Sequence, residues 1–541
     1  MTGSETKVLV IGLDGATFDL ILPWINSGKL QELSKLMKKG VHAPIKSTIP
    51  MFTATAWSSF ATGLNPGKHG ITGFIIRRND GKPKVATAND RRGKEVWTLL
   101  SNYSKRVIVV NVPLTYPPKR VNGILISGFL TPPQANKYAY PPKIISEIES
   151  ALGKRYMLYP RVVYEEGRED QFISAIHEVT EIHAEAMQYL MSQYAWDFSM
   201  IVFNGTDQLQ HALWKYVDPT FYEYDSEKAS KFREALLDFY MKIDDIISSL
   251  IKIAGDDSNV IITSDHGFGP LYKFIHINQW LMKKGYLKLR SNFTTFFKYY
   301  MHKLGITPAN IYHLLSRLHL GTLRLKLGRH RGHMLLSKFF LSANDIDWNK
   351  TIAYSMGSMG QIYLNIKALH QQNNDYNMIR EHIISQLVDL KDPETGQPII
   401  ERVYRKEEIY KGPLLEKMPD IVFVPKTGYI GFEEYEFASN RILTRPFNIS
   451  GTHRPLGILL MYGPYIKEKY LLLSIPQIED LSPTILYVLN LPIPSCMDGS
   501  PILDAFKEEY VKVHPPRYIL TSEKERIRKR LHLTRKNIFR E

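Results

Sequence analysis

The sequence predicts an α/β fold in which helices cover both faces of a mostly parallel central sheet. Short apolar runs, rich in β-branched residues and leucine, alternate along the chain with longer segments of helical periodicity. The apolar runs show no regular polar alternation, as expected for strands that are buried on both faces. Strands that alternate with helices are typical of a parallel sheet. At 541 residues, the chain is long enough for a large core with insertions.

Five apolar runs are expected to form buried parallel strands of this sheet. They are KVLVIGL (7–13), RVIVVNV (106–112), FSMIVFN (198–204), NVIITSD (259–265) and LGILLMYG (456–463). Two longer segments between the runs, 171–194 and 231–254, carry helical patterns. Apolar residues recur in these segments at spacings of three and four, which places them on one face of a helix.

The positive charge of the chain is concentrated in one segment. The net charge is +15, and the stretch from His266 to Asn344 holds 13 Lys and Arg residues and no Asp or Glu. Aromatic residues, leucine and basic residues are mixed there at loosely helical spacing, which predicts a mainly helical insertion over or beside the sheet. The insertion could be a solvated face without a partner, a lid that attracts an anionic substrate, or a surface for lipid headgroups or nucleic acid.

These patterns divide the chain into four parts. We expect residues 1–281 to form the first part of the core and residues 345–505 the second part. Residues 282–344 form the basic, aromatic helical insertion or cap between them. Residues 506–541 are expected to form a basic C-terminal tail.

Cysteine content and hydropathy bear on where the protein is found. The chain has one cysteine, Cys496, so no intramolecular disulfide can form. No apolar run reaches the roughly 18 residues that a membrane span needs. The first apolar stretch is short and Asp14 interrupts it, which predicts a core strand rather than a signal peptide. We expect a cytoplasmic protein, with peripheral membrane contact through the basic insertion left open and no indication of oligomeric state.

Acidic and histidine residues stand at the ends of the predicted strands. They are Asp14, Asp207, His211, Asp265, His266 and His453. Asp207 and His211 are four residues apart, which places both on one face of a helical turn. Sites in open α/β sheets form at the carboxyl ends of the strands. Three carboxylates and three imidazoles suit two metal ions with mixed nitrogen and oxygen ligands, most simply zinc.

Hydroxyl residues are clustered in STIPMFTATAWSSFATGLNPGKHGI, residues 47–71. Thr53, Thr55 and Ser58 are candidates for a nucleophile, although the same pattern also suits an ordinary helix start. A free threonine hydroxyl is a poor nucleophile until a base or a metal ion activates it. The metal-ligating residues at the strand ends make such activation plausible.

Six stretches together resemble the type I phosphodiesterase/nucleotide pyrophosphatase family, a branch of the alkaline phosphatase superfamily. They are VIGLDGAT (10–17), FTATAWSSFATGLNPGKHGI (52–71), NGTDQLQH (204–211), ITSDHGFG (262–269), GTH (451–453) and DLSPTILYVLNLPIPSCMDGSPI (480–502). They occur in the order of the family and span about residues 7–503, apart from the basic insertion. The resemblance implies an alkaline-phosphatase-like catalytic core.

The resemblance also implies roles for individual residues. Thr53 would be the nucleophile and would form a phospho-threonine intermediate. One metal site would use Asp207, His211 and His453, and the other Asp14, Asp265, His266 and the Thr53 oxygen. The metals would be two divalent ions, zinc by expectation, with manganese and iron as alternatives. The substrate would be an anionic phosphodiester or a nucleotide-type compound.

The chain departs from the family pattern at one position. Many family members carry an Asn shortly after the His-Gly-Ile, where it donates to the phosphoryl oxygen, and Phe74 stands at about that place here. Asn204 and Lys68 are candidate replacements. Two other functions stay open on the same scaffold. One is a phosphoryl-headgroup transferase that acts on lipid-linked substrates, and the other is a non-catalytic protein that binds nucleic acid or a membrane.

Overall fold

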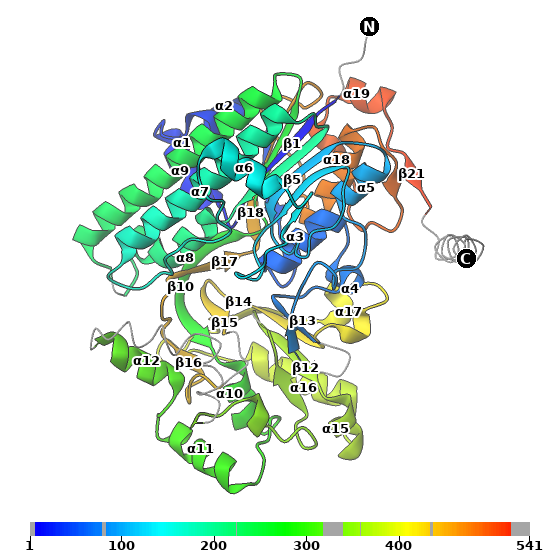
Figure 1. The fold of residues 1–541 in the computed structure, drawn as a ribbon. Coiled ribbons are helices and arrows are strands. Elements are labelled where there is room, and N and C mark those ends of the chain that lie inside the picture. Colours follow the sequence, from blue (N-terminus) through cyan, green and yellow to red (C-terminus); the bar gives the residue numbers. More distant parts are fainter. Residues whose placement is uncertain are drawn as a thin grey trace.

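The computed structural model describes residues 6–77, 83–222, 224–317, 339–357, 359–432 and 437–520. These residues form two lobes, one built on a large sheet and a smaller one below it (Figure 1). Among the described residues, no helix combines the length and the apolar character needed to span a bilayer.

The large lobe is built on a nine-stranded sheet in which all strands except β18 and β7 run in the same direction. In spatial order the strands are β19 (Tyr470–Leu471), β2 (Val41–Lys46), β18 (Leu456–Tyr462), β9 (Asn259–Thr263), β1 (Val8–Leu13), β8 (Phe198–Phe203), β5 (Val107–Val112), β6 (Gly123–Ser127) and β7 (Ala139–Tyr140). Each of the five predicted strands lies in this sheet. The mostly parallel architecture predicted from the sequence is therefore confirmed.

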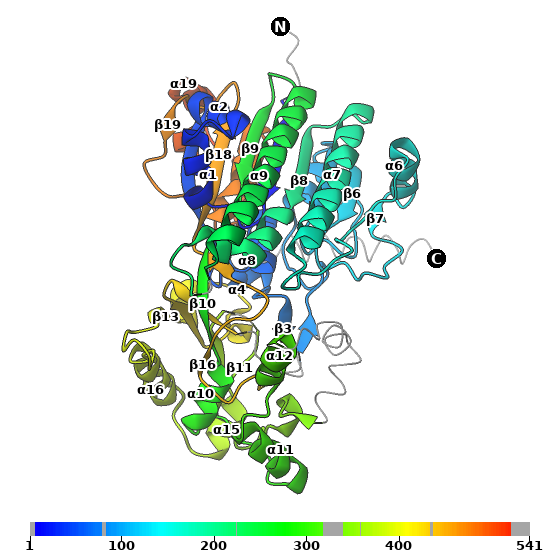
Figure 2. The ribbon, with the colours of Figure 1, turned by 90° about the vertical axis from the view of Figure 1, so that its left-hand side faces the viewer.

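Helices cover both faces of the large sheet (Figures 1 and 2). Successive residues of β1 contact opposite layers: Val8 and Val10 belong to one apolar cluster, and Leu9 and Ile11 to the other. The layer on the Leu9 side contains α1 (Phe18–Asn26), α2 (Gln31–Lys39), α6 (Ile144–Leu152), α7 (Glu169–Gln193), α8 (Gly205–Val217) and α9 (Ser226–Ala254). The opposite layer contains α3 (Thr53–Thr62), α5 (Val96–Asn102) and α18 (Leu481–Val488). Because both faces are covered, the strands need no polar alternation.

One predicted strand has the wrong direction. We expected residues 456–463 to run parallel to the other strands, but β18 pairs antiparallel with both β9 and β2. The start of an antiparallel strand lies at the edge where its parallel neighbours end. Residues just before β18 therefore reach the carboxyl-end edge of the sheet, where sites form in such folds.

The smaller lobe has its own sheets and its own apolar core, which runs from Ile275 to Phe437 along the chain. One sheet contains β10 (Gly267–Ile275), β15 (Gly428–Gly431), β16 (Leu443–Thr444) and β17 (Gly451–Arg454). The other contains β11 (Ala353–Ser355), β12 (Gln361–Leu364), β14 (Ile421–Pro425) and β13 (Ile400–Arg405). The helices are α10 (Ile277–Lys283), α11 (Phe293–Lys303), α12 (Pro308–Arg317), α15 (Ile366–Gln371), α16 (Tyr376–Val388) and α17 (Lys406–Ile409).

The remaining elements are short. They are α4 (Pro66–His69), α19 (Glu508–Val513), β3 (Ile75–Arg77), β4 (Pro83–Val85), β20 (Ile493–Pro494), β21 (Tyr518–Ile519) and 3-10 turns at Ala343–Asp345, Leu415–Lys417, Ile478–Asp480 and Leu503–Ala505.

The smaller lobe extends beyond the expected insertion. Helices α11 and α12 lie within 282–344, of which residues 318–338 fall outside the described part. Residues 353–444, which we expected in the second part of the core, pack with α10 in the separate apolar cluster instead. The chain rejoins the large lobe through β17 and β18. The expected tail, 506–541, is described as far as residue 520.

A buried ion pair joins α5 to the loop before it. The Glu95 carboxylate accepts from the Arg91 guanidinium at 3.0 Å and from the Lys119 ammonium at 2.5 Å. Burial alone would raise the pKa of Glu95, but these two cations outweigh it and lower the pKa to about 2. The side chains of Arg91 and Glu95 are 1% and 2% exposed, so solvent screens their attraction weakly.

We expect Glu95→Gln to lower the free energy of unfolding by about 3–5 kcal/mol at pH 7, because it leaves the Arg91 charge buried without a counter-charge. Since the folded pKa is lowered, the stability that Glu95 contributes is present above about pH 4.5 and is lost as the pH falls toward 2. Urea titrations at pH 7 and pH 3 measure both effects. The exposed Glu509→Gln serves as the control, and equal stability of the two variants at pH 7 would contradict the expectation.

Candidate active site

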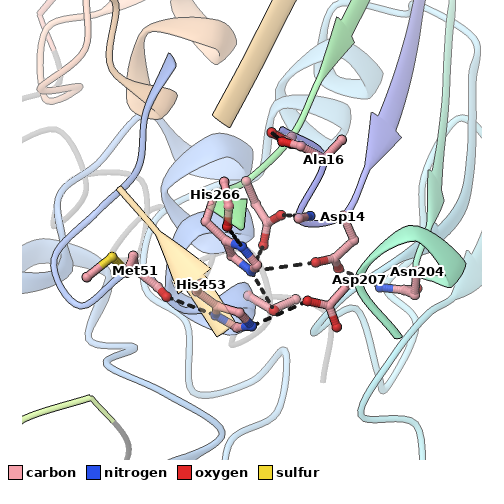
Figure 3. Close-up of polar contacts among 12 residues, drawn as sticks. Asp14, Ala16, Met51, Asn204, Asp207, His266 and His453 are labelled. Atoms are coloured by element: carbon pink, nitrogen blue, oxygen red, sulfur yellow. Dashed lines mark hydrogen bonds and ion pairs between the residues drawn. The ribbon is translucent and has the colours of Figure 1, made fainter. Parts of the chain in front are cut away.

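The six predicted metal-ligating side chains converge at one edge of the large sheet (Figure 3). Asp14 directly follows β1, and the pair Asp265–His266 lies between β9 and β10. Asp207 and His211 lie four residues apart on α8, which follows β8. His453 lies on β17, paired in antiparallel register with Phe268 of β10. The antiparallel course of the chain from β17 into β18 thus delivers the last ligand to the edge where the parallel strands end.

Three of these side chains form a tight first group. The Asp207 Oδ1 lies 3.4 Å from His211 Nε2 and 3.3 Å from His453 Nε2. The two imidazole Nε2 atoms lie 3.1 Å from each other. The group has the composition predicted for the first metal site.

The second group surrounds His266. Its Nε2 lies 3.2 Å from Asp265 Oδ2, 3.7 Å from Asp14 Oδ1 and 3.4 Å from the Thr53 hydroxyl oxygen. The His266 and His453 rings stack with centroids 3.6 Å apart, so the two groups adjoin. Asp207 also lies near this group, because its ligand atom and those of Asp14 and His266 lie within 4.8 Å of one another.

Backbone carbonyls fix the orientation of all three histidines. The Nδ1 atoms of His211, His266 and His453 lie 2.8, 3.0 and 3.1 Å from the carbonyl oxygens of Gly451, Gly267 and Met51. A carbonyl oxygen only accepts, so each Nδ1 carries the proton and each Nε2 presents a lone pair to the site. Burial lowers the pKa of His211 and His266, which keeps these imidazoles neutral, as metal ligation requires.

The three carboxylates repel one another in a buried space. Burial, followed by the charges of Asp265 and Asp207, raises the pKa of Asp14 well above its ordinary value. Burial also raises the pKa of Asp265 to about 7. Burial would raise the pKa of Asp207, but the adjacent imidazoles of His211 and His453 outweigh it and lower the pKa. In the described part of the chain, each carboxylate has one oxygen without a hydrogen-bond partner: Asp14 Oδ1, Asp207 Oδ1 and Asp265 Oδ2.

These side chains fit divalent cations. Unpaired buried carboxylate oxygens are costly unless a cation or a donor satisfies them. In tetrahedral coordination with bonds of about 2.0–2.1 Å, neighbouring ligand atoms are about 3.3 Å apart. The distances of 3.1, 3.3 and 3.4 Å in the first group match that spacing. From His266 Nε2, the oxygens of Asp265, Thr53 and Asp14 lie at 3.2, 3.4 and 3.7 Å, which is close to the same ligand spacing.

Thr53 is the first residue of α3, a helix of small and aromatic residues that is buried along its whole length. The first backbone N–H groups of a helix have no partner within the helix and favour a bound anion. The Thr53 hydroxyl faces His266, whereas the Thr55 hydroxyl is buried without a hydrogen-bond partner among the described residues. Residues two apart on a helix do not share a face, which explains the difference.

Two asparagines orient Asp14, and the sequence indicated only one of them. Asn204 Nδ2 donates to Asp14 Oδ2 at 2.6 Å, and Asn111 Nδ2 donates to Asn204 Oδ1 at 3.0 Å. Asn111 was not predicted, although it is the one polar residue in the buried strand β5. Gly15 was also missed. It has φ +65°, and a Cβ atom there would lie 3.2 Å from Asp207 Oδ1 and 3.3 Å from the His266 ring.

The two candidate replacements for the missing family asparagine differ in position. Asn204 lies beside Asp14 in the site. Lys68 instead pairs with Asp498 at 2.6 Å and donates to the Cys496 carbonyl, so it ties α4 to the C-terminal part of the large lobe. Phe74, at the family position, packs on Phe52 with ring centroids 4.3 Å apart. The site therefore has an aromatic wall where the family often has an amide donor.

The fold is that of an alkaline-phosphatase-like α/β protein. The fold is similar to that of phosphonoacetate hydrolase from Sinorhizobium meliloti 1021, with a TM-score of 0.53 and 14% identity over 90% of this chain and 95% of that one. It is also similar to the alkaline phosphatase PafA, with a TM-score of 0.53 and 15% identity over 94% of this chain and 100% of that one. The third similar structure is murine ectonucleotide pyrophosphatase/phosphodiesterase 5, in an inactive form bound to AMP. Its TM-score is 0.51, with 13% sequence identity over 93% of this chain and 100% of that one.

More particularly, the chain belongs to the type I phosphodiesterase/nucleotide pyrophosphatase family, whose model matches residues 8–442. It is therefore an enzyme, a phosphoryl-transfer hydrolase, and not the non-catalytic binding protein considered as an alternative. The match includes five of the six expected ligands, and His453 lies beyond it. No curated protein matches the chain.

We expect chelation of divalent cations to lower the Tm of the protein, because three buried carboxylates then face one another unscreened. Zinc at about 1,000 times its Kd should restore about 4 kcal/mol of stability. Because burial raises the folded pKa of Asp265 to about 7, the chelated protein loses stability as the pH rises through that value. The gap between the zinc-loaded and chelated Tm should therefore widen from pH 5 to pH 8.

Thermal melts with and without chelator measure this gap. Asp207→Asn should shrink the response to zinc, whereas the exposed Asp389→Asn should retain it. A zinc response that is the same in both variants would show that the cation binds elsewhere.

Proposed function

We propose that the protein cleaves phosphodiester or pyrophosphate bonds by attack of Thr53 on phosphorus, with a phospho-threonine intermediate. The observation that carries this proposal is the position of the Thr53 hydroxyl. It lies 3.4 Å from His266 Nε2, at the first turn of α3 and beside both groups of ligands. A hydroxyl in this place can reach a phosphoryl group held at the same edge of the sheet.

The residues have distinct tasks in this proposal. Asp207, His211 and His453 would hold one divalent cation, and Asp14, Asp265 and His266 would hold the other, with the Thr53 oxygen as a further ligand. When bound, the cations supply Lewis-acid chemistry: they make the threonine alkoxide accessible near neutral pH and neutralise charge on the phosphoryl oxygens. Zinc is the metal that the imidazole-rich ligand set favours, with manganese and iron as alternatives.

The reaction proceeds by two displacements at phosphorus. The Thr53 hydroxyl gives its proton to solvent, its oxygen forms a bond to phosphorus, and the bond to the leaving oxygen breaks. The leaving oxygen takes up a proton from solvent. The first N–H groups of α3 donate to the phosphoryl oxygens and favour their negative charge. Water then attacks the phospho-threonine, the bond from phosphorus to the Thr53 oxygen breaks, and the hydroxyl is restored.

The charge of the site favours a diester over a monoester. Within the described residues, Asp14, Asp207 and Asp265 form ion pairs with histidines and with no Lys or Arg. A monoester carries one more negative charge than a diester, and the ion pairs of these three carboxylates in the described part of the chain include no lysine or arginine that would compensate for it. A nucleotide-type diester is a suitable substrate, because the aromatic wall of Phe52, Phe74 and Phe129 offers ring faces beside His453. The AMP complex of the murine phosphodiesterase supports that class.

Thr53→Ala is expected to reduce kcat for bis(p-nitrophenyl) phosphate by about a thousandfold or more, as loss of a nucleophile does. Thr55→Ala, two residues further along the same buried helix, is the matched control and should retain activity within about threefold, since its hydroxyl faces away from the site. Acid-quenched wild-type protein should carry a p-nitrophenyl-phosphoryl group on the peptide that contains Thr53, because only one of the two esters of the substrate leaves in the first displacement. Activity of the Thr53 variant close to that of the control would refute the proposed nucleophile.

The preference for diesters can be measured directly. We expect kcat/KM for bis(p-nitrophenyl) phosphate to exceed that for p-nitrophenyl phosphate by about tenfold or more, which corresponds to roughly 1.4 kcal/mol. The comparison uses one preparation with its metal content determined. A preference for the monoester would keep the fold and the metal site but overturn the proposed substrate class.

A further inference from the structure

Helix α11 presents its aromatic residues to solvent. Phe293, Phe296, Phe297, Tyr300 and Leu304 are 84%, 66%, 56%, 54% and 63% exposed. Their spacing of three, four, seven and eleven residues from Phe293 places them along one face of the helix. An exposed apolar stripe of this kind is unusual on a soluble surface and marks a place where a partner binds.

The opposite face of α11 is polar and buried. Lys298 pairs with Asp345 at 3.1 Å, and Thr295 donates to the same carboxylate at 3.0 Å. His302 lies 3.1 Å from Gln279 Oε1 of α10. Turning the helix to bury its aromatic residues would break these buried contacts, so the outward orientation is fixed by the fold.

Exposed basic residues occur on α11 and between α10 and α11, and two of them lie beside the aromatic stripe. The exposed side chains of Lys283, Lys284, Lys288, Arg290 and Lys303 lie on α11 or in the segment before it. A groove of about 530 Å³ runs between that segment and α11, lined by Lys288, Arg290, Phe296 and Tyr299 among others. Since residues 266–344 contain no Asp or Glu, this surface has a local excess of positive charge.

The position of α11 allows a flat partner to approach. The helix lies at the far end of the smaller lobe, away from the large sheet, in both views of the molecule (Figures 1 and 2). A broad surface can therefore reach this helix without meeting the large lobe.

We propose that this surface, α11 with its exposed aromatic stripe and the basic residues around it, docks on anionic phospholipid bilayers. Aromatic side chains are favoured at the boundary between headgroups and acyl chains, and lysine and arginine are attracted to anionic headgroups. The aromatic stripe therefore suits the boundary between headgroups and acyl chains, and the basic residues suit the anionic headgroups. The proposal assigns the membrane contact to one helix, and it goes beyond the hydrolysis of phosphodiesters.

The test is sedimentation of the full chain with vesicles of phosphatidylcholine alone or mixed with phosphatidylglycerol. We expect binding to the mixed vesicles that weakens as salt is added. The variant Phe293→Ser, Phe296→Ser, Phe297→Ser should reduce the partition coefficient by about tenfold or more. The charge variant Arg290→Glu, Lys303→Glu should reduce binding to the mixed vesicles by a similar factor.

The matched control replaces three exposed apolar residues elsewhere: Leu473→Ser, Val513→Ser and Leu520→Ser. It should bind vesicles as the wild type does. All variants should keep the wild-type Tm and the wild-type rate on a soluble diester, so a failure here is distinguishable from a failure of the proposed catalysis. Equal vesicle binding by the phenylalanine variant and the wild type would overturn the proposal. So would a wild-type dimer, without vesicle binding, that the same three substitutions dissociate, because the stripe would then bind a second copy.

Discussion

The placement of three carboxylates within a few ångströms of one another is the constraint on which the rest of the structure depends. Asp14, Asp207 and Asp265 are held at one edge of the sheet, and each has an oxygen that the described side chains leave unsatisfied. Such a cluster is unfavourable in a buried site unless cations share it. Three imidazoles, each oriented by a backbone carbonyl, complete two groups with the ligand spacing of a tetrahedral metal. The catalytic chemistry is thus built into the electrostatics of the fold.

The chain path serves this cluster in two ways. The strands β1, β8 and β9 end at the same edge, so the residues that follow them meet without long loops. Between His266 and His453 the chain builds the smaller lobe and then returns, and the pairing of β10 with β17 brings the two histidines into contact. The site therefore lies where the lobes join, and the smaller lobe is placed to influence what enters it.

The two ends of the molecule offer different chemistry. The sheet edge holds three clustered carboxylates, whereas α11 and the segment before it hold basic side chains and exposed aromatic rings. If α11 binds a bilayer, a lipid-linked substrate would be concentrated near the enzyme. Such a substrate would also suit the headgroup transferase that the sequence left open as an alternative. The expected cytoplasmic location stays a prediction that is compatible with such peripheral contact.

The sequence by itself determined five strands and two long helices of the large lobe, and it predicted the six acidic and histidine side chains that the structure brings together beside Thr53, because strand ends and side-chain types are local features. Tertiary structure decided what depends on distant parts of the chain. The direction of β18, the packing of residues 353–444 in the smaller lobe, and the orienting role of Asn111 all arise from pairings between remote segments. Contacts with distant residues also decide that α11 turns its aromatic face toward solvent and its polar face inward. Its composition predicts a helix, but the buried contacts of Thr295, Lys298 and His302 determine which face meets water.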